Sequence, residues 1–309
     1  WGKKIYTPNF PQNLKSKIAM SNYNPWVTAL NRQVRSDLPN GGKIEYEDID
    51  CSCDVLSSLL YTLFQQNWQQ VELGHVAQGG VLELEFTNPP KICILYDGYL
   101  TVVAEGWHLH LCIDETFGGP NSQTPLELRR QRRISRAAFY RRFNAAGKPR
   151  SWGIELWNGS GENVMTIFLP NPFIDGENLL PEGKPNLAKL ELYQQLREIY
   201  ILGNKPMPFT KNPLKRSYIS VCTSGRCLPS RNWQPTFESL KNAVEKAGLD
   251  IEVGTSGCLE VCKLGPVVFN SEDKTWYTRV KPEVAETIVE KHLVQGNKVT
   301  EHLYPPESV

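Results

Sequence analysis

The sequence lacks an apolar run long enough to cross a membrane, and it lacks an excess of charge of either sign. A spanning helix needs about 20 consecutive apolar residues, and no stretch of this chain approaches that length. Lys and Arg number 34 against 33 for Asp and Glu, which leaves a formal charge of +1. Nucleic-acid binders usually carry a marked basic surplus. We therefore expect no membrane span, no export signal at the start of this sequence and no nucleic-acid partner.

The motifs of common hydrolases and nucleotide enzymes are also missing. The chain has no glycine-rich phosphate loop, no HExxH, and no Ser, His and Asp in a triad order. Its eight cysteines are few for a secreted disulfide scaffold of 309 residues, and four of them are clustered. A reducing, cytoplasmic location fits this cysteine usage best.

Apolar periodicity and turn signals divide the chain into two domains. Polar residues fill the first fifty positions, where we expect an irregular arm or an early strand; a helix, several strands and a second helix follow up to Gly203. Three prolines then fall between Asn204 and Pro213. We predict an α+β domain with an antiparallel sheet over residues 1–203, a Pro-rich linker over 204–214, and a smaller α/β domain over 215–309.

Four cysteines of the second domain lie in two loops, each of which follows a predicted strand. Four residues separate Cys222 from Cys227, thirty separate Cys227 from Cys258, and three separate Cys258 from Cys262. Four thiolates at one sheet edge suit tetrahedral zinc or an iron–sulfur cluster. The gaps of four and three residues within the two cysteine pairs are wider than the gap in the usual zinc knuckle. They favour the two irons of a [2Fe–2S] cluster. Zinc and four unligated buried thiols are the alternatives.

This stretch resembles the thioredoxin-like [2Fe–2S] ferredoxins, including the corresponding subunits of respiratory complex I and bidirectional hydrogenases. The residues that carry the resemblance are Cys222-Thr-Ser-Gly-Arg-Cys227, Cys258-Leu-Glu-Val-Cys262-Lys-Leu-Gly-Pro266 and the tail from Trp276 to Leu293. The resemblance implies a thioredoxin-like fold over about residues 215–303, and one-electron exchange with a redox partner protein. It also implies a [2Fe–2S] cluster held by Cys222, Cys227, Cys258 and Cys262. Because such proteins often pair, we expect a homodimer.

In the first domain, the segment from Trp107 to Ile113 alternates strictly between large apolar residues and His or Cys. On a strand, His108, His110 and Cys112 share one face while the apolar residues share the other. Two imidazoles and a thiol on one face suit a metal ion or a haem iron. The alternative is an ordinary polar, half-exposed sheet face.

An arginine-rich run follows that strand. It comprises Arg129, Arg130, Arg132, Arg133, Arg136, Arg141 and Arg142. Arginine suits bidentate pairing with carboxylates or phosphates, although a solvated helix face is the usual explanation for such a run. On a strand over residues 137–143, Ala138, Tyr140 and Arg142 point to one side, and the small side chain of Ala138 leaves room for a flat ligand.

The order of these pieces resembles the HemS/ChuX/HutX haem-utilisation fold. The pieces are Leu109-His110-Leu111, the hairpin from Phe143 to Gly161, and the strand from Val164 to Leu169. The resemblance implies haem or another tetrapyrrole as ligand, and only His110 falls on a matching piece. The chain departs from the pattern at Cys112 and at the exit Asn171-Pro172-Phe173.

Two functional hypotheses follow. In the first, a [2Fe–2S] cluster passes single electrons to or from a tetrapyrrole held by the N-terminal domain, which would make the protein an oxidoreductase acting on that ligand. The residues expected at the ligand are His108, His110, Arg132, Arg133, Tyr140 and Arg142. In the second, the protein is an electron-transfer or sensing module without catalysis, and its arginines dock an acidic protein partner.

Overall fold

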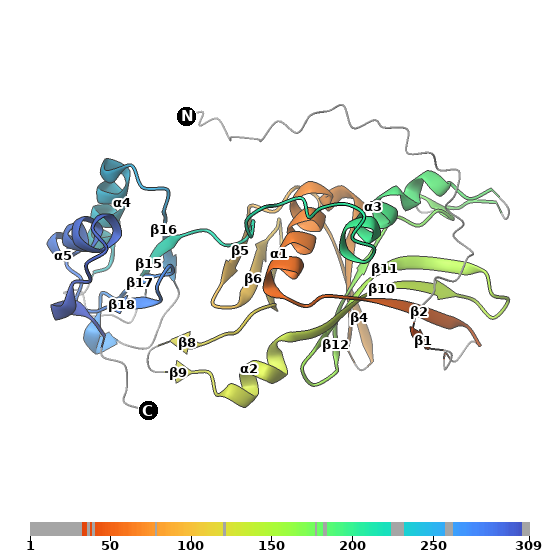
Figure 1. Cartoon of the computed structure of the whole chain (residues 1–309), viewed down its shortest axis with the longest axis horizontal. Coiled ribbons are helices and arrows are strands. Elements are labelled where there is room, and N and C mark those ends of the chain that lie inside the picture. The colour runs from red at the N-terminus through yellow and green to blue at the C-terminus, as the bar shows by residue number, and fades with distance from the viewer. Residues whose placement is uncertain are drawn as a thin grey trace.

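The computed structural model describes residues 33–35, 38, 41–77, 79–119, 122–176, 178–181, 184–223, 232–256 and 262–304. The described chain is a mixed α/β protein with several antiparallel sheets (Figure 1). Its two largest hydrophobic clusters run from Ile49 to Leu214 and from Ile219 to Val299. We call residues 33–202 the N-terminal region and residues 218–304 the C-terminal region.

The N-terminal region is built on a seven-stranded antiparallel sheet, as the strand patterns predicted. Its order is β1 (Gln33–Arg35), β2 (Lys43–Ile49), β10 (Ile134–Phe143), β11 (Pro149–Asn158), β12 (Asn163–Phe168), β3 (Glu72–Ala77) and β4 (Gly80–Glu85). The early strand expected within the first fifty residues is β2, which lies between β1 and β10. Residues 1–32, where an irregular arm was the alternative, lie outside the described residues.

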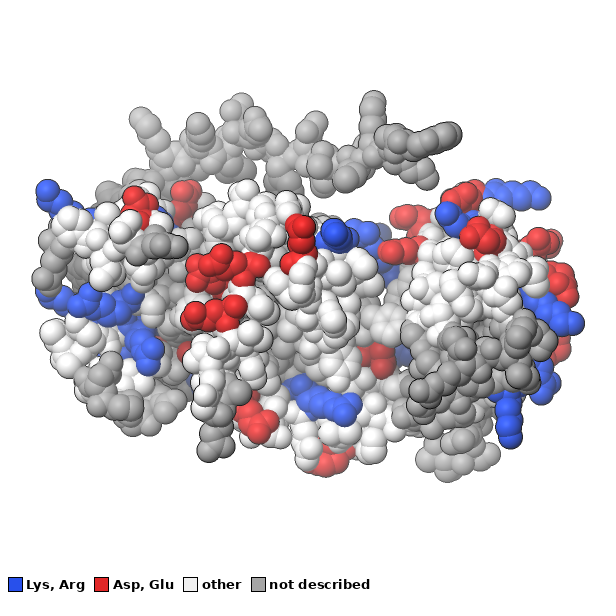
Figure 2. Space-filling view, turned by 180° about the vertical axis from the view of Figure 1, so that it is seen from behind, with Lys and Arg blue, Asp and Glu red and all other residues white. Residues whose placement is uncertain are grey.

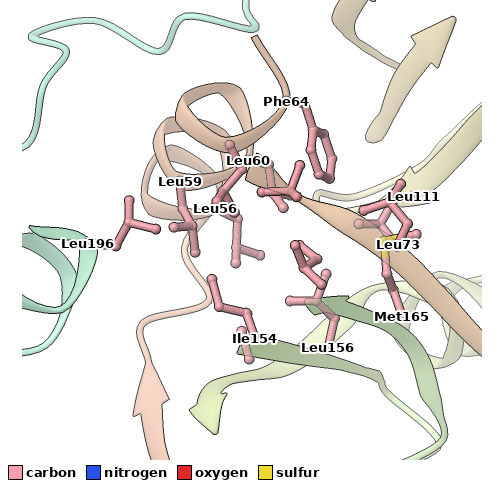
Figure 3. Close-up of a cluster of buried hydrophobic side chains, with 14 of the residues drawn as sticks. Leu56, Leu59, Leu60, Phe64, Leu73, Leu111, Ile154, Leu156, Met165 and Leu196 are labelled. Carbon is pink, nitrogen blue, oxygen red and sulfur yellow. The ribbon is translucent and has the colours of Figure 1, made fainter. Parts of the chain in front are cut away.

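Two helices cover one face of this sheet. Helix α1 (Cys53–Tyr61) continues into a π-helical turn, Thr62–Gln66, and a 3-10 turn, Trp68–Gln70; α3 (Glu191–Tyr200) follows a 3-10 turn, Leu187–Leu190. The leucines of α1 recur at helical spacing and point to the sheet, where they meet Ile154 and Leu156 of β11 (Figure 3). Burying one such side chain stabilises the fold by about 1.5–3 kcal/mol.

A smaller antiparallel sheet completes this core. It consists of β5 (Ile92–Tyr96), β6 (Tyr99–Val103) and β7 (His108–Cys112). The β5–β6 turn is Asp97-Gly98, and both residues have positive φ, 42° and 78°, as the two-residue turn of a twisted hairpin requires. The remaining short elements here are β8 (Gly118–Gly119), β9 (Ser122–Gln123), α2 (Leu126–Arg132), β13 (Ile174–Asp175) and β14 (Asn178–Leu179).

The C-terminal region has a four-stranded sheet of mixed direction. The order is β16 (Glu252–Ser256), β15 (Tyr218–Cys222), β17 (Val268–Asn270) and β18 (Thr275–Tyr277); β15 and β16 are parallel and the other pairs are antiparallel. The helical segments are α4 (Gln234–Ala247), α5 (Pro282–Thr287), a π-helical segment, Ile288–Val294, and 3-10 turns at Cys262–Leu264 and Thr300–His302. The apolar face of α4 packs on Ile219 and Val221.

The end of the predicted linker is attached to the N-terminal region. Leu214 is fully buried in that core, and its carbonyl accepts a hydrogen bond from the Leu95 amide at 3.0 Å. The Asn212 amide donates to Asp54 and Ser57, both at 2.9 Å. The last residues of the linker therefore belong to the packed structure, while the domain boundaries themselves stay a prediction.

No helix among the described residues combines the length and the apolar character needed to cross a membrane.

Candidate metal centre

The cysteine loops begin at one edge of the C-terminal sheet because β15 and β16 run parallel. Cys222, the last residue of β15, lies opposite Ser256, the last residue of β16. The Thr223 amide and hydroxyl both donate to the Ser256 carbonyl, at 3.0 and 2.8 Å. The chain therefore leaves the two strands at neighbouring points, after Thr223 and after Ser256. Cys227 and Cys258 belong to these loops and lie outside the described residues.

The Cys222 side chain is set in a small apolar cluster. Its Sγ accepts a hydrogen bond from the Val267 amide at 3.3 Å, and only 7% of the residue is exposed. Val267, Leu264 and Trp276 surround it. Cys262 begins the 3-10 turn that contains Leu264, and Leu264 packs against the cluster of Cys222 and Val267. A buried sulfur with an amide donor is a typical setting for a thiolate ligand.

His108 and His110 lie on one face of β7, as the alternation predicted. Leu109 and Leu111 point into the core, while the two imidazoles are exposed with ring centroids 5.4 Å apart. Nδ1 of His110 lies 3.0 Å from the Thr101 hydroxyl on β6. Within the part of the chain that the structure describes, no three His, Cys, Asp or Glu side chains converge on a metal site.

The surroundings of Cys112 raise the pKa of its thiol. Burial raises its pKa to about 11, although the neighbouring Arg132 and Arg133 guanidinium groups act in the opposite direction. The thiol also donates to the Asp114 carbonyl at 3.4 Å. This pKa favours the neutral thiol at neutral pH.

Tyr140 and Arg142 lie on β10, in the other sheet. Tyr140 is 3% exposed, and its ring packs so closely on Gly153 that a Cβ there would lie 2.6 Å from it. Ala138 is fully buried in a cluster with Ile44 and Tyr140. The open space expected above Ala138 is thus absent, because neighbouring side chains fill that sheet face. Arg142 is exposed.

The structure separates the six predicted ligand residues into two groups. The two histidines belong to the three-stranded sheet, and Arg132 and Arg133 lie close to Cys112 at its end. Tyr140 and Arg142 belong to the seven-stranded sheet. We expected all six residues around one ligand, and that expectation stays a prediction.

The arginine run has partners that sequence reasoning missed. The Arg141 guanidinium pairs with Glu45 at 2.7 Å, and both side chains are buried. Arg136 pairs with Asp48 at 2.9 Å. The antiparallel register of β10 with β2 brings these acids alongside the arginines. On the face shown in Figure 2, basic and acidic groups are interspersed rather than gathered by sign.

One protein family matches the larger part of the chain. The family described as "Family of unknown function (DUF7676)" matches residues 33–202, which contain the seven-stranded and the three-stranded sheets.

Curated ferredoxins match a shorter part. A 2Fe–2S ferredoxin of Clostridium pasteurianum is 31% identical over 94 residues, which cover 27% of this chain and 91% of the relative. A 2Fe–2S ferredoxin of Aquifex aeolicus is 50% identical over 44 residues, or 14% of this chain. The chain spans only 40% of that relative's length. These matches confirm the resemblance of part of the chain to the 2Fe–2S ferredoxins.

Two solved structures are each similar to part of the chain. The wild-type thioredoxin-like [2Fe–2S] ferredoxin of Aquifex aeolicus is 28% identical and covers 29% of this chain and 98% of its own, with a TM-score of 0.27. ChuX is 18% identical and covers 52% of this chain and 80% of its own, with a TM-score of 0.32.

The chain therefore belongs to the family of unknown function DUF7676 over residues 33–202 and, over 27% of its length, to the 2Fe–2S ferredoxins.

Proposed function

We propose that Cys222, Cys227, Cys258 and Cys262 hold a [2Fe–2S] cluster and that the protein transfers single electrons. The observation that carries this proposal is the parallel pairing of Cys222 with Ser256, from which both cysteine loops depart at one sheet edge. Thiolates are the ligands that such a cluster takes. When bound, the cluster supplies a one-electron redox couple.

The chain's own residues provide the setting that a cluster needs. The Val267 amide donates to the sulfur of Cys222, and such a bond stabilises negative charge on a ligand sulfur. Leu264, Val267 and Trp276 exclude water from one side of this sulfur. The donor set and its surroundings therefore fit the cluster.

Visible spectroscopy of the purified protein, before and after dithionite, tests this proposal. We expect charge-transfer bands that bleach on reduction and that Cys222→Ser abolishes. Cys51→Ser is the matched control, because Cys51 belongs to the N-terminal region, before α1, and not to the cysteine loops. A colourless protein that contains zinc would contradict the proposal.

We further propose that the electron partner is haem or another tetrapyrrole at the outward face of the three-stranded sheet. Support comes from the exposed His108 and His110 rings, 5.4 Å apart, since neutral imidazole is a good iron ligand. We expect a Soret shift when haem is added and its loss in a His108→Ala/His110→Ala variant. His75→Ala, which removes another exposed histidine, should retain the shift. An unchanged shift in the double variant would contradict this part.

Docking of an acidic protein partner is the second candidate function. Arg130 and Arg132 are exposed near one another on α2, which favours it. Arg136 and Arg141 are already paired within the chain, so the exposed basic surface is smaller than the sequence run indicates. Binding that weakens steeply between low and physiological ionic strength would support docking, whereas a buried ligand would respond little.

A further inference from the structure

A cavity of about 640 Å³ lies between the N-terminal and C-terminal regions. Five separate parts of the chain line it: the β5–β6 turn, residues 114–118, Arg133, the segment that leads into β15, and the β17–β18 hairpin. Figure 1 shows β5 and β6 beside the edge of the C-terminal sheet. Ligand pockets typically measure about 300–1,000 Å³ and often lie between structural units, so size and position both suit a small molecule.

Aromatic rings form one wall of this cavity. Tyr96 of β5 stacks on Tyr218 of β15, with centroids 5.1 Å apart and planes at 24°. Phe269 follows at 6.0 Å from Tyr218, and Trp276 at 4.4 Å from Phe269. All four residues line the cavity and are only partly buried. Half-exposed rings in a row offer a stacking surface to a planar molecule.

The charges at the cavity favour an acidic group on that molecule. Four basic and four acidic residues line the cavity, and three of the four carboxylates already accept hydrogen bonds from the chain, Asp114 among them from the Glu115 amide at 2.9 Å. Asp97 accepts three hydrogen bonds of 2.8–2.9 Å from residues 116–118, and Glu272 accepts one from a serine hydroxyl at 2.7 Å. Among the described residues, no carboxylate pairs with Arg133 or Arg216. Arginine is well suited to bind a phosphate or carboxylate.

The aromatic wall ends beside the candidate metal centre. Tyr218, Ser220 and Cys222 alternate with Ile219 and Val221, which point into the helical core. Tyr218 lies four residues before Cys222, or about 13 Å along the strand at about 3.3 Å per residue. At the other end of the wall, Trp276 packs against the Cys222 cluster.

We propose that this cavity binds a planar heteroaromatic molecule that carries a phosphate or carboxylate. Its ring stacks on Tyr218 and Phe269, and its acidic group is held by Arg216 and Arg133. That electrons are exchanged at this site rests on the proposed function, whereas the binding of the planar molecule does not. The site is separate from the exposed histidines of β7, which do not line the cavity.

Titration of the full-length protein with flavin mononucleotide, and separately with riboflavin, tests the site. Both probes share the planar ring, but only the first carries a phosphate. We expect stacking to quench the fluorescence of both. Arg216→Gln should raise the dissociation constant of flavin mononucleotide about tenfold, as the loss of one charge-assisted hydrogen bond predicts, and leave that of riboflavin within about twofold. Tyr218→Leu should weaken the binding of both.

Controls separate this inference from the proposed function. Arg130→Gln removes an exposed arginine outside the cavity and should change neither constant. The visible spectrum of each sample reports the cluster independently, so flavin binding without a cluster would sustain the site and contradict the proposed function. Haem binding that depends on Arg216 and Tyr218 would also support the site, with a tetrapyrrole as its ligand. If neither probe nor haem binds, or if Arg216→Gln changes nothing, the inference is wrong.

Discussion

Cys222 and Ser256 lie opposite each other at the ends of two parallel strands, and Thr223 links the two ends through bonds to the Ser256 carbonyl. This pairing connects the first cysteine loop to the second. Two cysteine motifs that are thirty residues apart in the sequence therefore begin at one edge of the sheet.

The Thr223 side chain should therefore stabilise the candidate metal centre. Thr223→Val keeps the shape of the side chain but removes its 2.8 Å hydrogen bond to Ser256, a loss of about 1 kcal/mol. We expect the cluster absorption to decay faster in air than in the unmodified protein. Thr287→Val removes a similar bond, of 2.9 Å to Glu283 on α5, and should leave the decay unchanged. Equal decay in both variants would contradict this role.

Two arginine–carboxylate pairs on β10 should differ strongly in their effect on stability. Arg141→Ala breaks a buried pair at 2.7 Å while Glu45 keeps its contact with Lys43 at 2.8 Å, and breaking a buried pair costs about 3–5 kcal/mol. Arg136→Ala breaks a pair whose side chains are 35% and 44% exposed, which costs about 0–1 kcal/mol. Denaturant unfolding of the two variants measures the difference. Similar midpoints would show that the Arg141 pair is not buried as described.

Asp273 should make the C-terminal region sensitive to acid. Burial alone would raise its pKa, but hydrogen bonds from Lys298 and Thr275 and the neighbouring positive charges outweigh burial and lower the pKa below the ordinary 3.8. The folded state thus favours the carboxylate. Its stabilising contribution is fully present above pH 3.8 and is lost as the pH falls through the lower, folded pKa.

The pH dependence of unfolding measures this contribution. Asp273→Asn should be less stable than the unmodified protein near pH 7. The gap should close as the pH falls below the ordinary pKa of about 4. Glu286→Gln, an exposed substitution on α5, is a control that should show a small, constant difference. A gap that widens in acid would contradict the direction of the shift.

The Cys112 thiol should react slowly at neutral pH. Its pKa of about 11 leaves little thiolate, which is the reactive form. We expect alkylation by iodoacetamide to rise about tenfold for each pH unit between pH 7 and 10, as followed by mass spectrometry of the peptide that contains it. Fast modification at pH 7 in the folded protein would show that Cys112 is more accessible and more acidic than its surroundings indicate.

Local patterns predicted much of the fold because the elements concerned carry their own periodicity. The leucines of α1 repeat at helical spacing, and the β10–β11 hairpin has a turn at residues 144–149 with alternating strands on both sides. Strand β3 was missed, because Glu72–Ala77 contains a glycine, a histidine and a glutamate among its six residues. Its place in the sheet comes from pairing with β12, which no local pattern reveals.

The candidate sites were predictable only where neighbours in sequence are also neighbours in space. Period-two alternation placed His108 and His110 on one face, and the structure agrees. The partners of Arg141 and Arg197 lie 96 and 150 residues away on β2, so the acids that neutralise these arginines were invisible to sequence reasoning. The cavity between the two regions was invisible for the same reason, since five separate parts of the chain line it.

The most direct test of the central claim is the iron and acid-labile sulfide content of the purified protein, together with its electron paramagnetic resonance spectrum after reduction. We predict two irons and two sulfides per chain and the signal of one unpaired electron on dithionite reduction, as expected for a [2Fe–2S] cluster. Cys222→Ser and Cys258→Ser should each lose both iron and signal. One zinc per chain with no sulfide, or an unchanged signal in these variants, would contradict the account.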